Sequence, residues 1–264
     1  MRIFAIGDVC GKIGCEKLLK VLPNFKKQQK IDFVIANGEN SAETNGITPQ
    51  SANMLFDAGV DVITGGNHSL KKKEVYNFLD ENPFVLRPHN LSEAEFGKGY
   101  AFVDCGYTSI AVINLSGTIY LEQLKASCPF KAADALIEKA KEDGAKIIMV
   151  DFHAEATSEK RALGLYLNGK VSAFFGTHTH VQTADAQILS GGTAYITDIG
   201  MTGPKDSVLG VKASIIISRL KDKDTSQRFV LEDGECFVNG CIFDINEKTG
   251  KAVSATPVYI GENQ

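Results

Sequence analysis

The stretch Val171-Ser-Ala-Phe-Phe-Gly-Thr-His-Thr-His180 contains two of the five histidines in this 264-residue chain. Its opening residues are mostly apolar and rich in β-formers, and they predict a short buried strand that ends at Gly176. His178 and His180 then lie on the loop at the carboxyl end of that strand, where ligands bind in open α/β sheets. Such a pair can bind Zn, Fe or Mn, or can be two solvated loop residues. Metal-binding residues at the ends of other strands would favour the metal site.

The composition is that of an ordinary globular protein, with 44% hydrophobic and 23% charged residues. A net charge of -4 argues against a dedicated binder of nucleic acid or anionic membranes. No apolar run approaches the ~18 residues of a membrane-spanning helix, and the run Ile3–Ile6 is too short for a signal sequence. We therefore expect a cytoplasmic protein whose six cysteines, which include no Cys-x-x-Cys pair, are free thiols.

The first 80 residues alternate between short apolar strands and amphipathic helices, which predicts a largely parallel sheet covered on both faces. Thr48 and Pro49 form an expected N-cap and first-turn pair, and Gly59 is the expected end of that helix. The expected strands are 2–7, 32–36 and 60–64, and the expected helices are 12–30, 48–58 and 71–80.

The second half continues the pattern and then becomes strand-rich. Helices are expected at 129–141 and 158–167, a glycine-rich loop at 198–204, and strands at 100–104, 110–115, 146–150, 171–175, 193–197, 214–220, 228–232, 236–245 and 252–260. No linker or repeat interrupts the chain. We therefore expect a single domain over 1–264, an α/β (α+β) sandwich of two mixed β-sheets flanked by helices.

Polar residues that can bind metals follow five of the predicted strands. Each alone has an ordinary explanation as a turn, cap or loop residue. Because all of them would lie at the same edge of one largely parallel sheet, we expect them to meet, and such a cluster is costly without a counter-charge. The set is larger than one ion needs and suits two ions ~3.5–4 Å apart that share a carboxylate. The residues are Asp8, Glu39, Asn40, Asn67, His68, His153, His178 and His180.

Six blocks of this sequence resemble the calcineurin-like metallophosphoesterases and, within them, the YmdB-like family of bacterial phosphodiesterases. They are Ile6-Gly-Asp-Val, Asn37-Gly-Glu-Asn, Gly65-Gly-Asn-His, Asp151-Phe-His-Ala-Glu-Ala-Thr-Ser-Glu-Lys160, Gly176-Thr-His-Thr-His-Val-Gln-Thr-Ala-Asp185 and Thr197-Asp-Ile-Gly-Met-Thr-Gly-Pro204.

The resemblance implies the fold of that superfamily and a centre of two metal ions, drawn from Fe, Mn, Zn and Mg. It places His68 beside the phosphate as an acid or an electrostatic stabiliser. One ion would be held by Asp8, Glu39, Asn40 and His180, and the other by Glu39, Asn67, His153 and His178, with Glu39 bridging.

This chain departs from the family pattern in two places. The wider superfamily begins with Asp-x-His, whereas position 10 is Cys, and Asn40 looks like the replacement for the missing His. We expect Cys10 to pack instead of binding metal, although a thiolate can bind Zn or Fe. The family usually continues Asn-His with Thr-Trp-Asp, where this chain has Ser69-Leu70-Lys71 and contains no tryptophan. That difference would affect the pocket wall and the substrate preference.

The resemblance implies a phosphodiesterase that acts on nucleotides, with 2',3'-cyclic nucleotides favoured, through attack by a hydroxide that bridges the two ions. Thr177, Thr179 and Asp185 either orient the imidazoles or are plain polar loop residues. Two alternatives remain open at this point. One is a phosphomonoesterase of the nucleotidase kind, and the other is a regulatory RNA- or protein-binding role with incidental turnover. We expect no membrane partner and a homo-oligomer, either a dimer or a tetramer.

Overall fold

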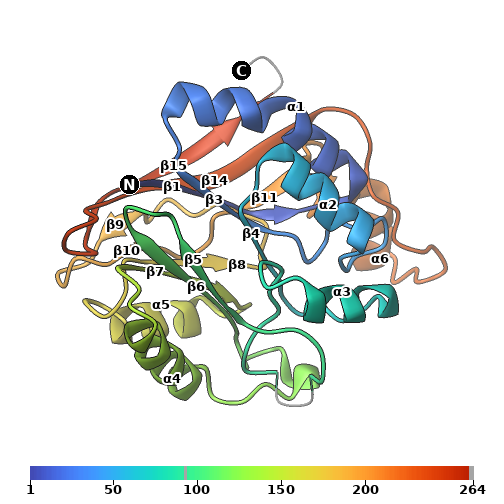
Figure 1. Ribbon diagram of the computed structural model, residues 1–264. Helices are drawn as coiled ribbons and strands as arrows, with labels where there is room; N and C mark the ends of the chain where they lie inside the picture. Colours follow the sequence, from blue (N-terminus) through green and yellow to red (C-terminus); the bar gives the residue numbers. More distant parts are fainter. Residues whose placement is uncertain (92–93, 262–264) are drawn as a thin grey trace.

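Two mixed β-sheets lie face to face in the computed structural model, which describes residues 1–91 and 94–261 (Figure 1). Helices α1 (Gly11–Gln29) and α2 (Pro49–Ala58) cover one sheet, and α4 (Pro129–Glu142) and α5 (Thr157–Tyr166) cover the other (Figure 1). This arrangement confirms the expected α/β sandwich of two mixed sheets flanked by helices. The last residues of the expected domain 1–264 lie outside the described range, and its single-domain character stays a prediction.

The first sheet joins the two ends of the chain. Its strand order is β2-β11-β14-β1-β3-β4, and β15 pairs with β14 outside this path. β1, β3 and β4 are parallel, whereas β14 runs antiparallel to both β1 and β11. A late strand thus lies beside the first one. The strands are β1 (Arg2–Ile6), β2 (Asp8–Val9), β3 (Phe33–Asn37), β4 (Val62–Thr64), β11 (Met201–Pro204), β14 (Cys236–Ile245) and β15 (Ala252–Ile260).

The second sheet has the order β5-β6-β7-β8-β10-β9. Its four central strands are parallel, and antiparallel strands close both edges. A separate hairpin consists of β12 (Ser207–Val208) and β13 (Val211–Lys212). The strands of the second sheet are β5 (Tyr100–Asp104), β6 (Ser109–Ser116), β7 (Ile147–His153), β8 (Ala173–Thr177), β9 (Gln187–Ile188) and β10 (Ala194–Ile196).

The start and end of α2 follow the local signals in the sequence. The Thr48 hydroxyl accepts a hydrogen bond from Ser51 N (3.1 Å), and the Ser51 hydroxyl accepts one from Thr48 N (3.0 Å). Pro49 occupies the first turn, and Gly59 ends the helix in the left-handed conformation at φ 101°. The helix predicted for 48–58 is therefore confirmed.

A shared apolar layer holds the two sheets together. Ile3 and Ile35 of the first sheet pack in one buried cluster with Val112, Met149 and Phe175 of the second. Burial on both faces explains why these strands are almost continuously apolar. This packing brings the carboxyl ends of β1, β3 and β4 close to those of β7 and β8. Among the described helices, none is both long and apolar enough to cross a membrane.

Two strand predictions in the C-terminal third are wrong. Residues 214–220 form most of helix α6 (Ala213–Lys221), in which Ile215 is buried and Ile217 is exposed. Three consecutive isoleucines favour a strand by propensity, but tertiary context overrides that preference here. Residues 228–232 form no strand and make a single isolated bridge, between Val211 and Leu231.

Three further expectations need correction. The loop expected at 198–204 contains strand β11, because Thr202 and Gly203 pair with β14. The helix expected at 71–80 begins later, as a 3-10 turn at Lys73–Val75 that leads into α3 (Tyr76–Glu81). A second 3-10 turn, at Glu122–Leu124, was not predicted. The metal-competent residues do not follow strands of one sheet but of two, whose carboxyl edges meet.

Candidate metal centre

The structure brings all eight predicted site residues into one connected cluster. The first sheet contributes five of them, from β2 and from the loops after β3 and β4, and the second sheet contributes three, from the end of β7 and the loop after β8. The strands end at this edge, so their last residues and the following loops converge there. The five are Asp8, Glu39, Asn40, Asn67 and His68, and the three are His153, His178 and His180.

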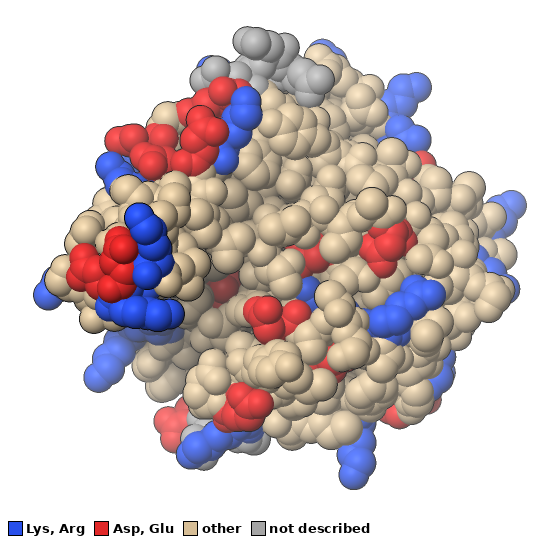
Figure 2. All heavy atoms as spheres, turned by 180° about the vertical axis from the view of Figure 1, so that it is seen from behind, with Lys and Arg blue, Asp and Glu red and all other residues tan. Residues whose placement is uncertain are grey.

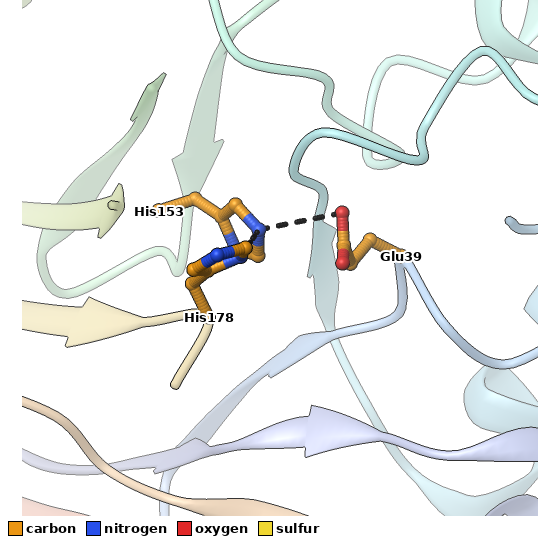
Figure 3. A group of neighbouring side chains, drawn as sticks. All are labelled: Glu39, His153 and His178. Atoms are coloured by element: carbon orange, nitrogen blue, oxygen red, sulfur yellow. Dashed lines mark hydrogen bonds and ion pairs between the residues drawn. The ribbon is translucent and has the colours of Figure 1, made fainter. Parts of the chain in front are cut away.

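Half of the cluster converges on the ring of His153. Its Nε2 lies 2.8 Å from Asn67 Oδ1, 3.0 Å from His178 Nδ1 and 3.4 Å from Glu39 Oε2. The rings of His153 and His178 meet edge to face at 76°. Figure 3 shows them together, with the Glu39 carboxylate facing His153. The donor atoms of Glu39, His153 and His178 lie within 4.8 Å of one another, a spacing that one ion can span. Four metal-binding groups therefore face one small space.

The other half surrounds Asp8. Its Oδ1 is buried and has no hydrogen-bond partner among the described residues. The same atom lies 3.8 Å from His180 Nε2, and Asn40 Nδ2 lies 3.4 Å from that nitrogen. Asn40 also donates to Glu39 Oε1 (2.8 Å), which connects the two halves. A buried carboxylate oxygen without a donor is costly, and a cation would remove that cost.

Each of the three metal-competent imidazoles has its outer nitrogen occupied. His178 Nε2 lies 3.0 Å from Glu155 Oε2, His153 Nδ1 lies 3.0 Å from Thr177 Oγ1, and His180 Nδ1 lies 3.2 Å from the carbonyl oxygen of Leu209. Such contacts fix the tautomer and orientation of a metal-binding histidine. They leave His178 Nδ1, His153 Nε2 and His180 Nε2 facing the interior of the cluster.

The loop that carries His178 and His180 has an unusual backbone. Both residues have positive φ angles, 100° and 63°, which cost of order 1–3 kcal/mol each in residues other than glycine. Thr179 between them donates from its N (3.1 Å) and its hydroxyl (2.8 Å) to Asp198, which also accepts from Lys160 Nζ at 2.7 Å. Lys160 and Asp198 are both buried. This ion pair therefore holds the strained loop in place.

His68 lies inside the cluster, in contact with several of its other members. Its Nδ1 is 3.1 Å from both Glu39 Oε1 and Asn40 Oδ1, and its backbone N donates to Glu39 Oε2 at 2.8 Å. Asn67 Nδ2 lies 3.1 Å from its Nε2. The side chain is 28% exposed and lines the cavity described below. Its ring is thus both beside the proposed ligands and within reach of a bound molecule.

Burial changes the proton affinities within the cluster. It raises the pKa of Asp8 well above the ordinary value, and the nearby carboxylates of Glu39 and Asp198 raise it further. It lowers the pKa of His153 to about 3 and also lowers that of His180. Neutral imidazoles are the form that binds metal. A bound cation would offset this effect and favour the ionised carboxylate of Asp8.

Several charged groups that support the cluster, most of them buried, were not predicted. Asp151 accepts hydrogen bonds from Thr64, Thr177 and Asn37, and burial raises its pKa to about 7. Glu155, Lys160 and Asp198 lie within the quoted sequence blocks but received no role. The signal that could have found Asp151 is a carboxylate inside an apolar strand.

Of the three residues expected to orient imidazoles, Thr177 does contact one. Thr179 contacts Asp198 instead, and Asp185 contacts Thr183 and Thr197. Cys10 is buried, its Sγ lies 3.7 Å from His180 Nδ1, and burial raises the pKa of its thiol well above the ordinary value. A protonated thiol on the outer side of His180 agrees with a packing role.

A cavity of about 360 Å³ opens over the cluster. The departure at Ser69-Leu70-Lys71 does not line this cavity, and Ser69 instead exchanges hydrogen bonds with the backbone of Gly66. The lining residues are Cys10, Glu39, Asn40, Asn45, His68, Glu155, His178, Thr179, His180, Val208, Leu209, Val211, Ile216, Phe229 and Leu231.

The chain is similar in sequence to a known protein family and to a curated bacterial enzyme. The family model described as "YmdB-like protein" matches residues 4–258. The 2',3'-cyclic-nucleotide 2'-phosphodiesterase of Bacillus subtilis (strain 168) is 45% identical over 263 residues, which cover 100% of this chain and 98% of that protein.

Solved structures give the same result. A crystal structure of a phosphatase from Mycoplasma pneumoniae superposes with a TM-score of 0.93 at 34% identity, over 99% of this chain and 94% of that one. The calcineurin-like phosphoesterase YfkN of Bacillus subtilis shares the fold, with a TM-score of 0.57 at 12% identity over 99% of this chain and 90% of that one. The chain therefore has the calcineurin-like phosphoesterase fold and belongs to the family of YmdB-like proteins.

Proposed function

We propose that this protein is a metal-dependent phosphodiesterase that hydrolyses 2',3'-cyclic nucleotides. The observation that carries the proposal is the cluster of eight converging side chains, in a chain with 45% identity to a protein that bears this activity in its name. A cyclic phosphodiester is compact and carries one negative charge, so it fits a small cavity beside a cation site.

The side chains of the cluster suit two metal ions. Oxygen and imidazole donors without thiolate favour Mn, Fe, Zn or Mg over softer ions. Gly66 keeps room for the side chains of Glu39 and His153, since a β-carbon there would lie 2.3 Å from both Glu39 Oε2 and His153 Nε2. We propose that Asp8, Glu39, Asn40 and His180 hold one ion and that Glu39, Asn67, His153 and His178 hold the other.

Bound ions would lower the pKa of water at the site and neutralise charge on the phosphoryl oxygens. The proposed reaction forms one bond to phosphorus and breaks another. A water oxygen forms a bond to phosphorus, the P–O2' bond breaks, and the product is a nucleoside 3'-phosphate with a free 2'-hydroxyl. We propose that His68, which lines the cavity, gives the proton that the departing 2'-oxygen needs.

The proposal is tested with purified protein whose metal content is known. We expect hydrolysis of 2',3'-cyclic AMP to 3'-AMP, measured by liquid chromatography, in the presence of Mn²⁺ or Fe²⁺. A second candidate, a phosphomonoesterase, is supported by the description of the Mycoplasma pneumoniae structure as a phosphatase. Faster turnover of p-nitrophenyl phosphate than of bis-p-nitrophenyl phosphate would favour that candidate and contradict ours.

We further propose a cytoplasmic homo-oligomer, a dimer or a tetramer, formed by one domain per chain. Exposed apolar side chains on α6, Ile217 and Leu220, support an interface between copies. Light scattering after gel filtration measures the oligomeric state, and a monomer would contradict it. A regulatory role with RNA as its target is less well supported, since the chain has a net charge of -4.

A further inference from the structure

Residues 206–234 leave the first sheet and return to it at the same point. β11 and β14 already pair at Pro204 and Cys236, and Lys205 N donates to Glu235 O at 2.8 Å. The sheet is therefore closed without the intervening segment, which we name the excursion. It contains the hairpin β12–β13, helix α6 and the extended residues up to Leu231. The excursion contributes no strand to either sheet, so its contacts with other parts of the molecule indicate its role.

The hairpin of the excursion reaches the metal-competent cluster. Leu209 and Gly210 form its turn, with φ angles of 55° and 95°. The carbonyl oxygen of Leu209 lies 3.2 Å from His180 Nδ1. A β-carbon at Gly210 would lie 3.3 Å from Cys10, so the turn packs closely beside the cluster. The excursion is therefore fixed against the site.

One wall of the cavity is apolar and comes from the excursion. The other lining residues include Glu39, His68 and His178. Within the apolar wall, Phe229 remains 53% exposed, and the guanidinium of Arg219 lies 4.3 Å from its ring centroid. The wall consists of Val208, Leu209, Val211, Ile216, Phe229 and Leu231.

The described lining residues of the cavity include two carboxylates and three histidines but no Lys or Arg. Glu39 belongs to the metal-competent cluster, and Glu155 is 49% exposed at the edge of the cavity. On the face shown in Figure 2, acidic side chains lie around the hollowed middle, and basic ones lie both beside them and at the margin. Among the described lining residues, a second phosphate on the substrate would therefore meet Glu155 and no Lys or Arg, although Arg219 lies over the ring of Phe229.

We propose that the apolar wall of the excursion is a nucleobase subsite. The base packs against Phe229 and Leu231 while the single cyclic phosphate lies at the metal-competent cluster. This inference rests on the proposed function and makes it narrower. The substrates are mononucleoside cyclic phosphates, in preference to cyclic phosphodiesters that lack a base or carry a further phosphate. Stacking of a base on an aromatic ring is a contact that any of the four bases can make.

The test compares two substrates that share the five-membered cyclic phosphate and differ in the base. We expect the metal-loaded enzyme to have a kcat/KM at least about 10-fold higher for 2',3'-cyclic AMP than for glycerol 1,2-cyclic phosphate. Phe229→Ala should lose about that factor on 2',3'-cyclic AMP, through KM, and keep the wild-type kinetics on the glycerol compound.

Val230→Ala is the matched control, because Val230 is 50% exposed, follows Phe229 directly and does not line the cavity. It should behave as wild type with both substrates. Calorimetric binding of 3'-AMP, the expected product, gives a second readout that needs no turnover. Its Kd should rise about 10-fold in Phe229→Ala and stay unchanged in Val230→Ala.

Two results would overturn the subsite and leave the proposed function standing. They are equal kcat/KM values of the wild type on both substrates, and equal losses of Phe229→Ala on both. If neither substrate is hydrolysed, the proposed function fails, and the 3'-AMP titration alone decides on the subsite. Should Phe229→Ala prove unstable in a melting curve, Phe229→Leu keeps the wall apolar without the ring, and wild-type 3'-AMP binding by that variant would contradict stacking.

A substrate with two phosphates tests the preference for a single phosphate. Adenosine 2',3'-cyclic phosphate that carries a 5'-phosphate should have a lower kcat/KM than 2',3'-cyclic AMP. A value equal to or above that of 2',3'-cyclic AMP would show that the cavity tolerates a second phosphate and would overturn the preference for one.

Discussion

Glu39 is the residue that both halves of the cluster share. Its Oε2 lies 3.4 Å from His153 Nε2, and its Oε1 accepts from Asn40 at 2.8 Å. We expect Glu39→Gln to lower the bound metal and nearly to abolish phosphodiester hydrolysis while the protein stays folded, because an amide cannot neutralise two cations. Elemental analysis, turnover and circular dichroism measure the three effects.

Glu43→Gln is the control for this prediction. Glu43 follows the same strand but is exposed and does not line the cavity over the cluster. It should keep full metal content and activity. Full metal occupancy and wild-type turnover in Glu39→Gln would end the interpretation as a two-metal centre.

His68 is the candidate acid, and the variant His68→Ala distinguishes this role from stabilisation of the phosphoryl group. We expect His68→Ala to keep both metals and to lose ~10²–10⁴-fold in kcat on 2',3'-cyclic AMP. The loss should be smaller on bis-p-nitrophenyl phosphate, because nitrophenolate leaves without a proton and an alkoxide does not. His89→Ala, which alters a histidine outside the cluster, should leave both rates unchanged.

Equal losses of His68→Ala on the two substrates would assign His68 to stabilising the phosphoryl group and would remove the acid role. Loss of one metal would mean that His68, whose Nδ1 lies 3.1 Å from Glu39 Oε1, belongs among the ligands.

At the scale of elements, the ion pair between α5 and the segment after β10 supports the histidine loop. Lys160→Met leaves the buried Asp198 without its counter-charge, and we expect a loss of about 3–5 kcal/mol in the free energy of unfolding. Metal affinity should fall as well, because Thr179 is held by Asp198. Urea unfolding and metal titration measure these effects.

Lys170→Met is the matched control in the same part of the chain. It breaks a pair of exposed side chains, Lys170 and Asp134 at 3.2 Å, and should cost at most about 1 kcal/mol. Equal costs for the two lysine variants would contradict a supporting role of the buried pair.

A second ion pair joins β1 to β14 and predicts a pH dependence. Arg2 Nε donates to Asp244 Oδ1 at 2.7 Å, and this hydrogen bond lowers the pKa of Asp244. Because the folded pKa lies below the unfolded value, the stabilisation is present above the unfolded pKa and is lost as pH falls through the folded pKa.

We therefore expect Arg2→Met to destabilise the protein at pH 7 but not at a pH below the folded pKa of Asp244. The cost at pH 7 should be small, since both side chains are about a third exposed and water screens their attraction. Urea unfolding at several pH values tests this, with Lys12→Met, which breaks an exposed pair within α1, as a comparison. A cost for Arg2→Met that does not change with pH would refute the assignment.

Elements with clear local signals could be predicted from the sequence, and those governed by distant contacts could not. α2 has a capping residue, Pro49 and Gly59, all of which act within a few residues. α6 has three consecutive isoleucines that favour a strand in isolation. β11 exists because it pairs with β14, more than thirty residues later, and no local pattern encodes that pairing.

The same distinction applies to the candidate site. The eight clustered residues each lie at or just after a recognisable strand, so a site at strand ends could be expected. That these ends belong to two sheets whose carboxyl edges meet could not. Glu155 and Lys160 lie in polar stretches, and their partners His178 and Asp198 are distant in the sequence. Their supporting contacts depend on how the two sheets and α5 pack, which composition and periodicity do not specify.

At the scale of the whole molecule, the cluster joins the two sheets, so metal should stabilise the fold as a unit. Removal of metal with a chelator should lower the melting temperature, since a ligand at 1,000 times its Kd contributes about 4 kcal/mol per site. Calorimetry with and without Mn²⁺ measures the shift. The Glu39→Gln protein should show a much smaller one, and equal shifts in the two proteins would place the stabilising ion elsewhere.

The position of β14 has a consequence for how the protein is made. β14 spans Cys236–Ile245 yet lies between β1 and β11, so the ribosome delivers the centre of the first sheet long after β1. While the nascent chain is incomplete, β1 exposes an unpaired edge of apolar backbone, the kind of edge that invites aggregation. Asp8 and Glu39 emerge early, but the sheet that positions them closes only after β14 has been made. We therefore expect metal to be captured only after β14 has joined the sheet, and a chain that stops short of β14 to expose the edge of β1 to chaperones and proteases.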